Sequence, residues 1–337
     1  MINNRINTLI SKFNKYNIDG YIIPKNDEFF SEYSANDRLK TISNFSGSAG
    51  FSIILKKKKY LFVDGRYTIQ AKKESGKNFQ IVDLNKIINC NLFKNLSIGF
   101  DPKFFTSLQI KKFFYKNNKV KSIDSNLIDQ ILKNKGKSSK PFFSLKNKIV
   151  GEDYKTKIMK IRKYLNKNKS DYLFITAPEN VAWLLNIRGH DNPNSPIPNC
   201  HLIISNKGIF HLISYKKKVS KLINEKKIKS NQVIEPKNLN KFISNLKGKK
   251  IIIDKNTCSI FFENILKKKF KILSIVDPIY SLKSLKNKTE IKNMLNAHIF
   301  DGVALTKFIY WIKNVNKKTI TEFEAQNKLE NFRKKNK

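Results

Sequence analysis

The chain has 337 residues, enough for two or more compact domains, and 40% of them are hydrophobic, which is enough to build cores. Its formal charge is +41, but the lysines are spread along the chain, and arginine, the better reader of phosphates and bases, occurs only six times. This pattern excludes specific nucleic-acid binding as a leading interpretation and predicts only weak, salt-sensitive attraction to polyanions.

Membrane insertion and secretion are not predicted either. No stretch reaches the roughly eighteen consecutive apolar residues that a membrane span needs, and the N-terminus lacks the unbroken apolar core of a signal peptide. We therefore expect a soluble, cytoplasmic protein with no membrane partner. Cys90, Cys200 and Cys258 are far apart and odd in number, so we expect reduced, mostly buried thiols in place of disulfides or a zinc site.

The first half of the chain predicts an α/β domain. Apolar residues at helical spacing indicate a helix over 2–16, and short apolar runs separated by turn residues indicate strands. A Gly/Ser turn at 46–50 precedes a hairpin, so it offers no helix N-terminus to a phosphate. The expected elements after the first helix are strands at 20–24, 51–55, 60–64, 79–84, 97–102 and 120–124, with helices at 66–75 and 106–117.

The second half repeats this pattern. Each half opens with a helix and a buried strand, continues with a hairpin, and closes with a strand, an aspartate, a helix and a final strand. We place the boundary between two related α/β domains near residues 146–152. The expected elements are helices at 153–168, 180–186, 238–248 and 259–269, with strands at 172–176, 201–205, 209–214, 250–256 and 272–278.

Residues from 285 onward predict a third, helical part. A long helix, with Thr289 as a plausible N-cap and Glu290 in its first turn, is followed by a second helix from about Thr321. Two helices with an apolar stripe and no sheet to cover it suggest an incomplete domain, so we expect a piece of a longer protein; a natural truncation is the alternative. The stripe consists of Ile291, Leu295, Ile299, Val303, Phe308 and Ile312.

The residue types present do not form a recognisable catalytic set. Metalloprotease, P-loop and nucleophile-elbow motifs are all missing from the sequence, and His298 with Asp301 is too small a group to predict a metal site. His201 and His211 fall in the second hairpin. His190 and Asp191 are the most suggestive neighbours, because such a pair can act as acid and base, but no nucleophile adjoins them. We interpret their proline-rich segment as a shaped loop that faces a site.

Several segments in order resemble the three-domain Xaa-Pro aminopeptidases, the aminopeptidase P branch of the creatinase/prolidase metallopeptidases. The segments are DGYIIPKNDEFFSEY, ISNFSGSAGFSIIL, FVDGRYTIQA, GFDP, AWLLNIRGHDNPNSP, IVDPI and EIKNMLNAHIFDGVALTKFIYWI. Each is weak alone, whereas the ordered set is specific and runs from about residue 18 to the end.

The resemblance implies an α/β fold with two tandem creatinase-N-terminal-like domains, at 1–148 and 149–284. Residues 285–337 would then be the first helices of a truncated pita-bread catalytic domain. In this family, two divalent metals, usually manganese, activate a water that cleaves the peptide bond before a penultimate proline. The metal ligands lie beyond the helix pair, so we expect no catalytic residue, no metal ligand and no bound metal in this chain, and no activity of the chain alone. Peptides with proline in second position are the implied partners, and a homodimer is possible for the full-length protein.

One substrate-binding residue follows from the resemblance. The family's DGR segment matches Asp64-Gly65-Arg66, and its arginine reaches toward the bound peptide; the alternative is that Arg66 pairs with Asp64 or a helix end. Arg188 and His190 are further candidates for substrate binding, in a loop that faces the catalytic domain. Two other functions stay open: a non-catalytic peptidase-like interaction module, and a related creatinase or prolidase activity.

Overall fold

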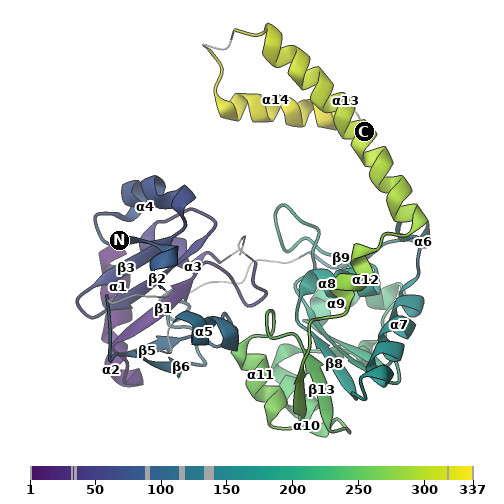
Figure 1. Cartoon of the computed structure of the whole chain (residues 1–337), viewed down its shortest axis with the longest axis horizontal. Coiled ribbons are helices and arrows are strands. Elements are labelled where there is room, and N and C mark those ends of the chain that lie inside the picture. The colour runs from purple at the N-terminus through teal and green to yellow at the C-terminus, as the bar shows by residue number, and fades with distance from the viewer. Residues whose placement is uncertain are drawn as a thin grey trace.

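A computed structural model describes residues 2–31, 33, 36–87, 92–113, 118–132, 140–316 and 319–335. This part of the chain forms two α/β domains in contact with each other, and a pair of long helices that projects from the second domain (Figure 1). None of its helices is both long and apolar enough to cross a membrane.

The first domain is built on a six-stranded mixed sheet with the order β4-β3-β2-β1-β5-β6. The central strand β1 pairs antiparallel with β2 and parallel with β5, and all five of its residues are buried, as expected for a strand covered on both faces. Side chains of α1 such as Ile6 and Leu9 pack in the core on one face, and a second apolar cluster around Phe62 and Phe100 fills the other. The elements are α1 (Ile2–Ser11), α2 (Phe13–Tyr16), β1 (Gly20–Pro24), α3 (Arg38–Ser43), β2 (Gly50–Leu55), β3 (Lys59–Val63), η1 (Gly65–Tyr67), α4 (Thr68–Ser75), β4 (Gln80–Asp83), η2 (Leu84–Ile87), β5 (Ser97–Phe100), α5 (Ser107–Phe113) and β6 (Lys119–Ser122).

The second domain repeats the first. Its sheet has the order β12-β11-β10-β8-β13-β14, with the same strand directions at each corresponding pair, which confirms the repeat expected from the sequence. The elements are β7 (Phe143–Ser144), α6 (Asn147–Val150), α7 (Tyr154–Lys167), β8 (Tyr172–Ile175), α8 (Pro178–Leu185), β9 (Ile187–Arg188), β10 (His201–Ser205), β11 (Phe210–Ile213), α9 (Lys216–Asn224), η3 (Ser230–Gln232), β12 (Val233–Ile234), η4 (Pro236–Asn238), α10 (Leu239–Asn245), β13 (Lys250–Ile253), α11 (Ile260–Lys267), β14 (Lys271–Ser274) and α12 (Ile279–Ser284).

Helix α9 and strand β12 were not expected from the sequence. The helix opens with three lysines, and only Val219 and Leu222 are buried, so its apolar pattern is short. The segment just before the expected boundary also packs on the second domain. Phe142 lies in that domain's core, and β7 pairs with β9.

The C-terminal pair consists of α13 (Lys288–Asn314) and α14 (Glu322–Lys335), which fold back on each other and extend away from both sheets (Figure 1). The N-cap of α13 is Asn287, and the expectation of Thr289 was wrong. The Asn287 side chain accepts a hydrogen bond from the Glu290 N–H, and the Glu290 carboxylate accepts one from the Asn287 N–H, which is a complete capping box. Four residues of the expected apolar stripe, Ile291, Leu295, Ile299 and Val303, are between 43% and 64% exposed.

Candidate functional site

Arg66 lies in the turn η1, where strand β3 gives way to helix α4. Asp64 caps this turn, because its Oδ1 accepts a hydrogen bond from the Arg66 backbone N–H at 2.9 Å. The same carboxylate accepts from the Arg66 guanidinium at 2.6 Å, which holds the pKa of Asp64 below its usual range. The Arg66 side chain is still 70% exposed. The pairing with Asp64 that the sequence offered as an alternative is therefore present, and it fixes a guanidinium at the surface.

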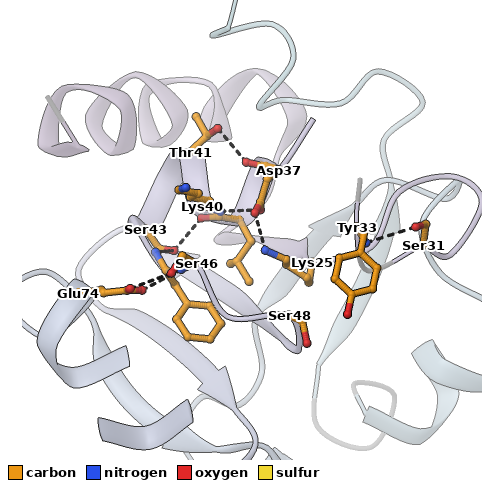
Figure 2. A network of polar contacts seen from close by, with 12 residues as sticks. Lys25, Ser31, Tyr33, Asp37, Lys40, Thr41, Ser43, Ser46, Ser48 and Glu74 are labelled. Carbon is orange, nitrogen blue, oxygen red and sulfur yellow. Dashed lines mark hydrogen bonds and ion pairs between the residues drawn. The ribbon is translucent and has the colours of Figure 1, made fainter. Parts of the chain in front are cut away.

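The Gly/Ser turn that precedes β2 is held by side-chain hydrogen bonds between Ser46 and Glu74 (Figure 2). Glu74 of α4 accepts from the Ser46 backbone N–H and from its hydroxyl, each at 2.8 Å. The Ser48 hydroxyl lies 2.9 Å from the hydroxyl of Tyr67, the residue after Arg66. These contacts join the turn to α4 and η1, so the surface that carries Arg66 is rigidly supported.

Arg188 of strand β9 is half-buried and binds backbone oxygens. Its Nη1 donates to the carbonyl of Ile187 at 2.8 Å and to that of Ala182 at 3.2 Å. Burial lowers the pKa of the guanidinium, and the charge of Glu290 opposes this effect. Arg188 also lines a surface hollow of about 590 Å³ together with Glu290 and Trp183. The contacts of Arg188 thus join α8 to the loop that follows it.

His190 lies in a different place. Its ring is exposed and stacks on Phe143 with a centroid distance of 5.2 Å. Asp191 next to it accepts from Lys218 at 2.8 Å and from the Asn199 N–H at 2.7 Å. The carboxylate that could have made an acid–base pair with His190 is thus engaged by other groups. His190 lines a cavity between the two domains, so the structure separates it from Arg188.

The cavity between the domains has a volume of about 680 Å³ and was not expected from the sequence. Two kinds of contact join the domains around it. The backbone N–H groups of Ile260 and Phe261 donate to the carbonyls of Phe105 and Pro102, and the Phe29 ring stacks on the His201 ring with a centroid distance of 4.8 Å. One wall comes from the segment after β1, which contributes Asp27, Glu28 and Phe29.

His201 is a buried, neutral histidine. Its Nδ1 lies 2.9 Å from the Thr176 carbonyl oxygen, and the ring is enclosed by Phe29 and Phe262. Burial lowers the pKa of His201 to about 4. It therefore carries no charge at neutral pH, which fits a packing role.

Metal-ligating side chains do not gather in the described part of the chain. Within those residues no group of three His, Cys, Asp or Glu side chains could hold an ion. Asp301, the expected neighbour of His298, pairs instead with Arg333 at 2.7 Å. Described residues therefore do not fit a dinuclear metal centre. Of the cysteines, Cys200 and Cys258 are buried and free, and Cys90 lies outside the described residues.

Comparison with known families accounts for both halves of the chain. Residues 5–131 match a family described as the creatinase/prolidase N-terminal domain, and residues 133–290 match a second family of the same description. Each half is thus similar to a creatinase/prolidase N-terminal domain. The first match ends at residue 131 and the second begins at residue 133.

Curated relatives of this tandem pair carry the name Xaa-Pro aminopeptidase. The chain is 30% identical to Xaa-Pro aminopeptidase 1 of Dictyostelium discoideum, over 99% of this chain and 57% of that protein. It is 29% identical to the probable Xaa-Pro aminopeptidase P of Laccaria bicolor, over 98% of this chain and 54% of that protein. The chain thus spans little more than half the length of the curated relatives it matches.

A solved structure has the same fold. The X-prolyl aminopeptidase of Caenorhabditis elegans, described as a cytosolic enzyme with a di-nuclear active site, matches with a TM-score of 0.86 and 23% identity. The match covers 99% of this chain and 60% of that one. At this identity it shows the fold alone. That fold includes the two creatinase domains and the helices that follow them.

Proposed function

We propose that this chain is the N-terminal part of an Xaa-Pro aminopeptidase, a hydrolase that removes the residue before a penultimate proline from peptides. The observation that carries the proposal is a similarity that covers 99% of this chain but 57% of the Dictyostelium discoideum relative. The cytosolic relative of the same fold supports a cytoplasmic location. A homodimer of the complete protein is part of the proposal.

The proposal gives the three parts of the chain different roles. Residues 1–148 and 149–284 are proposed as the two creatinase domains, although the end of the first range, from Phe142, packs on the second domain. Residues 285–337 are proposed to begin a pita-bread catalytic domain. The exposed apolar stripe of α13 supports this last assignment, because an apolar face of that length is normally covered. Two metal ions, proposed to be manganese, would be held by residues of the catalytic domain beyond α14. The chain by itself is therefore proposed to be inactive.

Arg66 is the proposed substrate-binding residue. Its guanidinium is exposed, permanently charged and fixed at its base by Asp64, and a planar fork of donors suits the carbonyls or carboxylate of a peptide. Arg188 and His190 are proposed to belong to a segment that faces the catalytic domain. The contacts of Arg188 with two backbone carbonyls favour positioning of that loop over direct contact with a peptide.

Two experiments test the proposed function. The first is to sequence the transcript past the codon for Lys337. An open frame that encodes two Asp, one His and two Glu at the spacing of a dinuclear site supports the proposal, and a stop codon favours a non-catalytic interaction module.

The second experiment is to incubate the purified chain 1–337 with manganese and an Xaa-Pro-Xaa peptide. We expect no release of the first residue; hydrolysis would overturn the inactivity of the isolated chain.

A third experiment tests Arg66 in the protein encoded by the complete reading frame. Because charge-assisted hydrogen bonds are strong, Arg66→Ala is expected to reduce kcat/KM about 10- to 100-fold, and Arg66→Lys to recover only part of it. Arg162→Ala, at an exposed arginine of α7, is the matched control and should leave kcat/KM unchanged. Equal activity of Arg66→Ala and the wild type would refute the role.

A further inference from the structure

The cavity between the two creatinase domains has the size and character of a small-molecule site. Its volume of about 680 Å³ lies within the range of ligand pockets, and such pockets occur preferentially between domains. Both domains contribute walls: the loop after β1 from the first, and the segments after β9 and β11 from the second. A ligand bound here would contact both domains.

The apolar part of the lining is largely aromatic. Phe29 comes from the first domain, and Tyr215, Phe261 and Phe262 come from the second. Tyr215 is 59% exposed, so much of its ring is open to contact. His201 is neutral at physiological pH and adds another flat ring beside Phe29. These rings suit an aliphatic or aromatic side chain of moderate size.

Some of the charged groups at the cavity are already neutralised by the protein. Arg38 makes two hydrogen bonds to the carboxylate of Asp129, at 2.7 and 2.8 Å, and Lys218 pairs with Asp191 at 2.8 Å. These two cations keep their protein partners and are poorly suited to capture a free anion.

Other charged groups at the cavity make no close ion pair within the described part of the chain. In the first domain, Asp27 accepts only backbone N–H groups, from Phe29 and Ser31, and Glu28 has no ion-pair partner among the described residues. In the second domain, the Lys237 side chain is 77% exposed and lies 3.5 Å from Glu235. The first domain also contributes Lys103, whose Nζ lies 5.1 Å from the centre of the Phe261 ring. The cavity thus offers two carboxylates and an ammonium group on the first domain and a loosely held ammonium group on the second.

Buried polar atoms at the same cavity lack partners. The hydroxyl oxygen of Ser214 and the amide oxygen of Asn199 have no hydrogen-bond partner in the described part of the chain, and both residues line the cavity. Ser214 as a whole is only 3% exposed. Unpaired buried polar atoms are rare in folded proteins, and these two belong to residues of the cavity wall although the oxygens themselves are shielded from solvent.

We propose that this interdomain cavity binds a zwitterionic α-amino compound with an apolar side chain, either a free amino acid or a dipeptide. The ammonium group of the ligand pairs with Glu28 and Asp27, its carboxylate pairs with Lys237, and its side chain packs among Phe29, Phe261 and Phe262. Two carboxylates on one wall disfavour a phosphate or other polyanion. The proposal does not depend on the proposed peptidase function, because the cavity lies between the two creatinase domains and uses none of the Arg66 surface.

The test is isothermal titration calorimetry of the chain 1–337 with four probes: L-phenylalanine, L-leucyl-L-phenylalanine, phenylacetate and phenethylamine. The last two each lack one charge of the zwitterion. We expect at least one zwitterion to bind at least about tenfold more tightly than either singly charged probe. The stronger of the two zwitterions identifies the free amino acid or the dipeptide as the ligand. Absence of heat with both zwitterions at about 10 mM, or equal affinity for phenylacetate, overturns the proposal.

Variants locate the binding to the cavity. Glu28→Gln and Lys237→Gln remove one charge each from opposite domains and should each weaken zwitterion binding about tenfold or more. Glu322→Gln and Lys247→Gln are matched controls, because both are exposed and lie outside the cavity. Equal weakening by the controls, or unchanged binding in both cavity variants, would place the ligand elsewhere and refute the site. Because all four positions are at the surface or partly exposed, the variants are expected to fold.

Discussion

Lys157 of helix α7 is a buried cation, and its burial predicts a specific pH dependence of stability. Lys157 is 1% exposed, and its Nζ donates to the Asn186 side-chain oxygen at 2.7 Å and to the Trp183 carbonyl at 3.0 Å. The Nζ also lies 4.0 Å from the centre of the Trp183 ring. None of these partners carries a full negative charge. Desolvation therefore dominates and lowers the pKa of Lys157 from 10.5 to about 8, against the weaker attraction of Glu290 and Glu152.

The size and sign of the effect follow from linkage. Between pH 8 and 10.5 the unfolded chain holds a proton on Lys157 that the folded chain has lost, so the free energy of unfolding rises with pH in this window. At about 1.4 kcal/mol per pH unit, the gain across the window is about 3 kcal/mol. Below pH 8 both states are charged, and the folded state bears the full desolvation cost.

Urea unfolding of the wild type and Lys157→Met across pH 7 to 11 measures this gain. Other lysines and tyrosines titrate in both proteins, so the informative quantity is the wild-type minus variant difference in unfolding free energy. It should be flat near pH 7 and rise by about 3 kcal/mol between pH 8 and 10.5. Lys163→Met, at an exposed position of the same helix, should give a difference independent of pH. A constant difference for Lys157→Met as well would refute the reasoning.

Three further predictions concern local structure. Asn287→Ala removes the N-cap of α13 and the hydrogen bond from Asn287 to the Val150 carbonyl, so it should lower the free energy of unfolding by about 1–2 kcal/mol in urea titrations. The control Thr289→Ala should lower it by less than about 0.5 kcal/mol. The reverse order would show that the cap is misassigned. Phe29→Ala uncovers one face of the His201 ring, so the pKa of His201 measured by NMR should rise from about 4 toward about 6.5, and an unchanged value would contradict the packing explanation. Leu173→Ala, at a fully buried position of β8, should lower unfolding free energy by about 2–5 kcal/mol, and a loss below about 1 kcal/mol would mean that this core relaxes freely.

The strands of both sheets were predictable because buried strands leave a simple pattern. A run such as Tyr172–Ile175 is apolar throughout and bounded by polar residues, and such runs are typical of central strands covered on both faces. Helix α9 was not predictable in this way, because it is rich in lysine and buries only Val219 and Leu222, too few to give a helical apolar pattern. The prediction of the α13 N-cap was wrong for another reason. Asn287 and Thr289 are both capable N-caps, and only the three-dimensional path of the chain selects between them.

The parts of the candidate site that the sequence predicted are those formed by residues close together in the chain. Arg66 lies at the end of a hairpin strand, as the sequence predicted, because strand and turn signals adjoin it. His190 and Asp191 adjoin in sequence, yet the Asp191 carboxylate is engaged by Lys218 and the Asn199 N–H. The interdomain cavity joins Phe29 to Phe262, two residues from different domains, and no local pattern in the sequence specifies such a contact.

The repeat also explains the recurrent aspartates that the sequence placed after a strand in each half. Asp101 follows β5 and accepts from the Lys103 N–H at 2.9 Å and from the Asn126 side chain at 3.0 Å. Asp254 follows β13 at the corresponding position and accepts from the Asn256 N–H at 2.9 Å and from the Asp277 N–H at 3.0 Å. Each carboxylate therefore ties the loop after one strand to the segment after the edge strand. These acids are structural in both domains.

The two domains differ in the side chains that follow the second strand of the hairpin. Strand β3 ends before Asp64, Gly65 and Arg66, and its counterpart β11 ends before Ser214 and Tyr215. The first copy presents an exposed guanidinium at this position. The second presents a buried hydroxyl that has no hydrogen-bond partner among the described residues, and an exposed aromatic ring at the interdomain cavity. One topological position, the end of the second hairpin strand, thus carries the proposed peptide contact in one domain and part of the proposed zwitterion site in the other. Because both domains have the same sheet order, we propose that the different side chains at this position give the two domains different ligands.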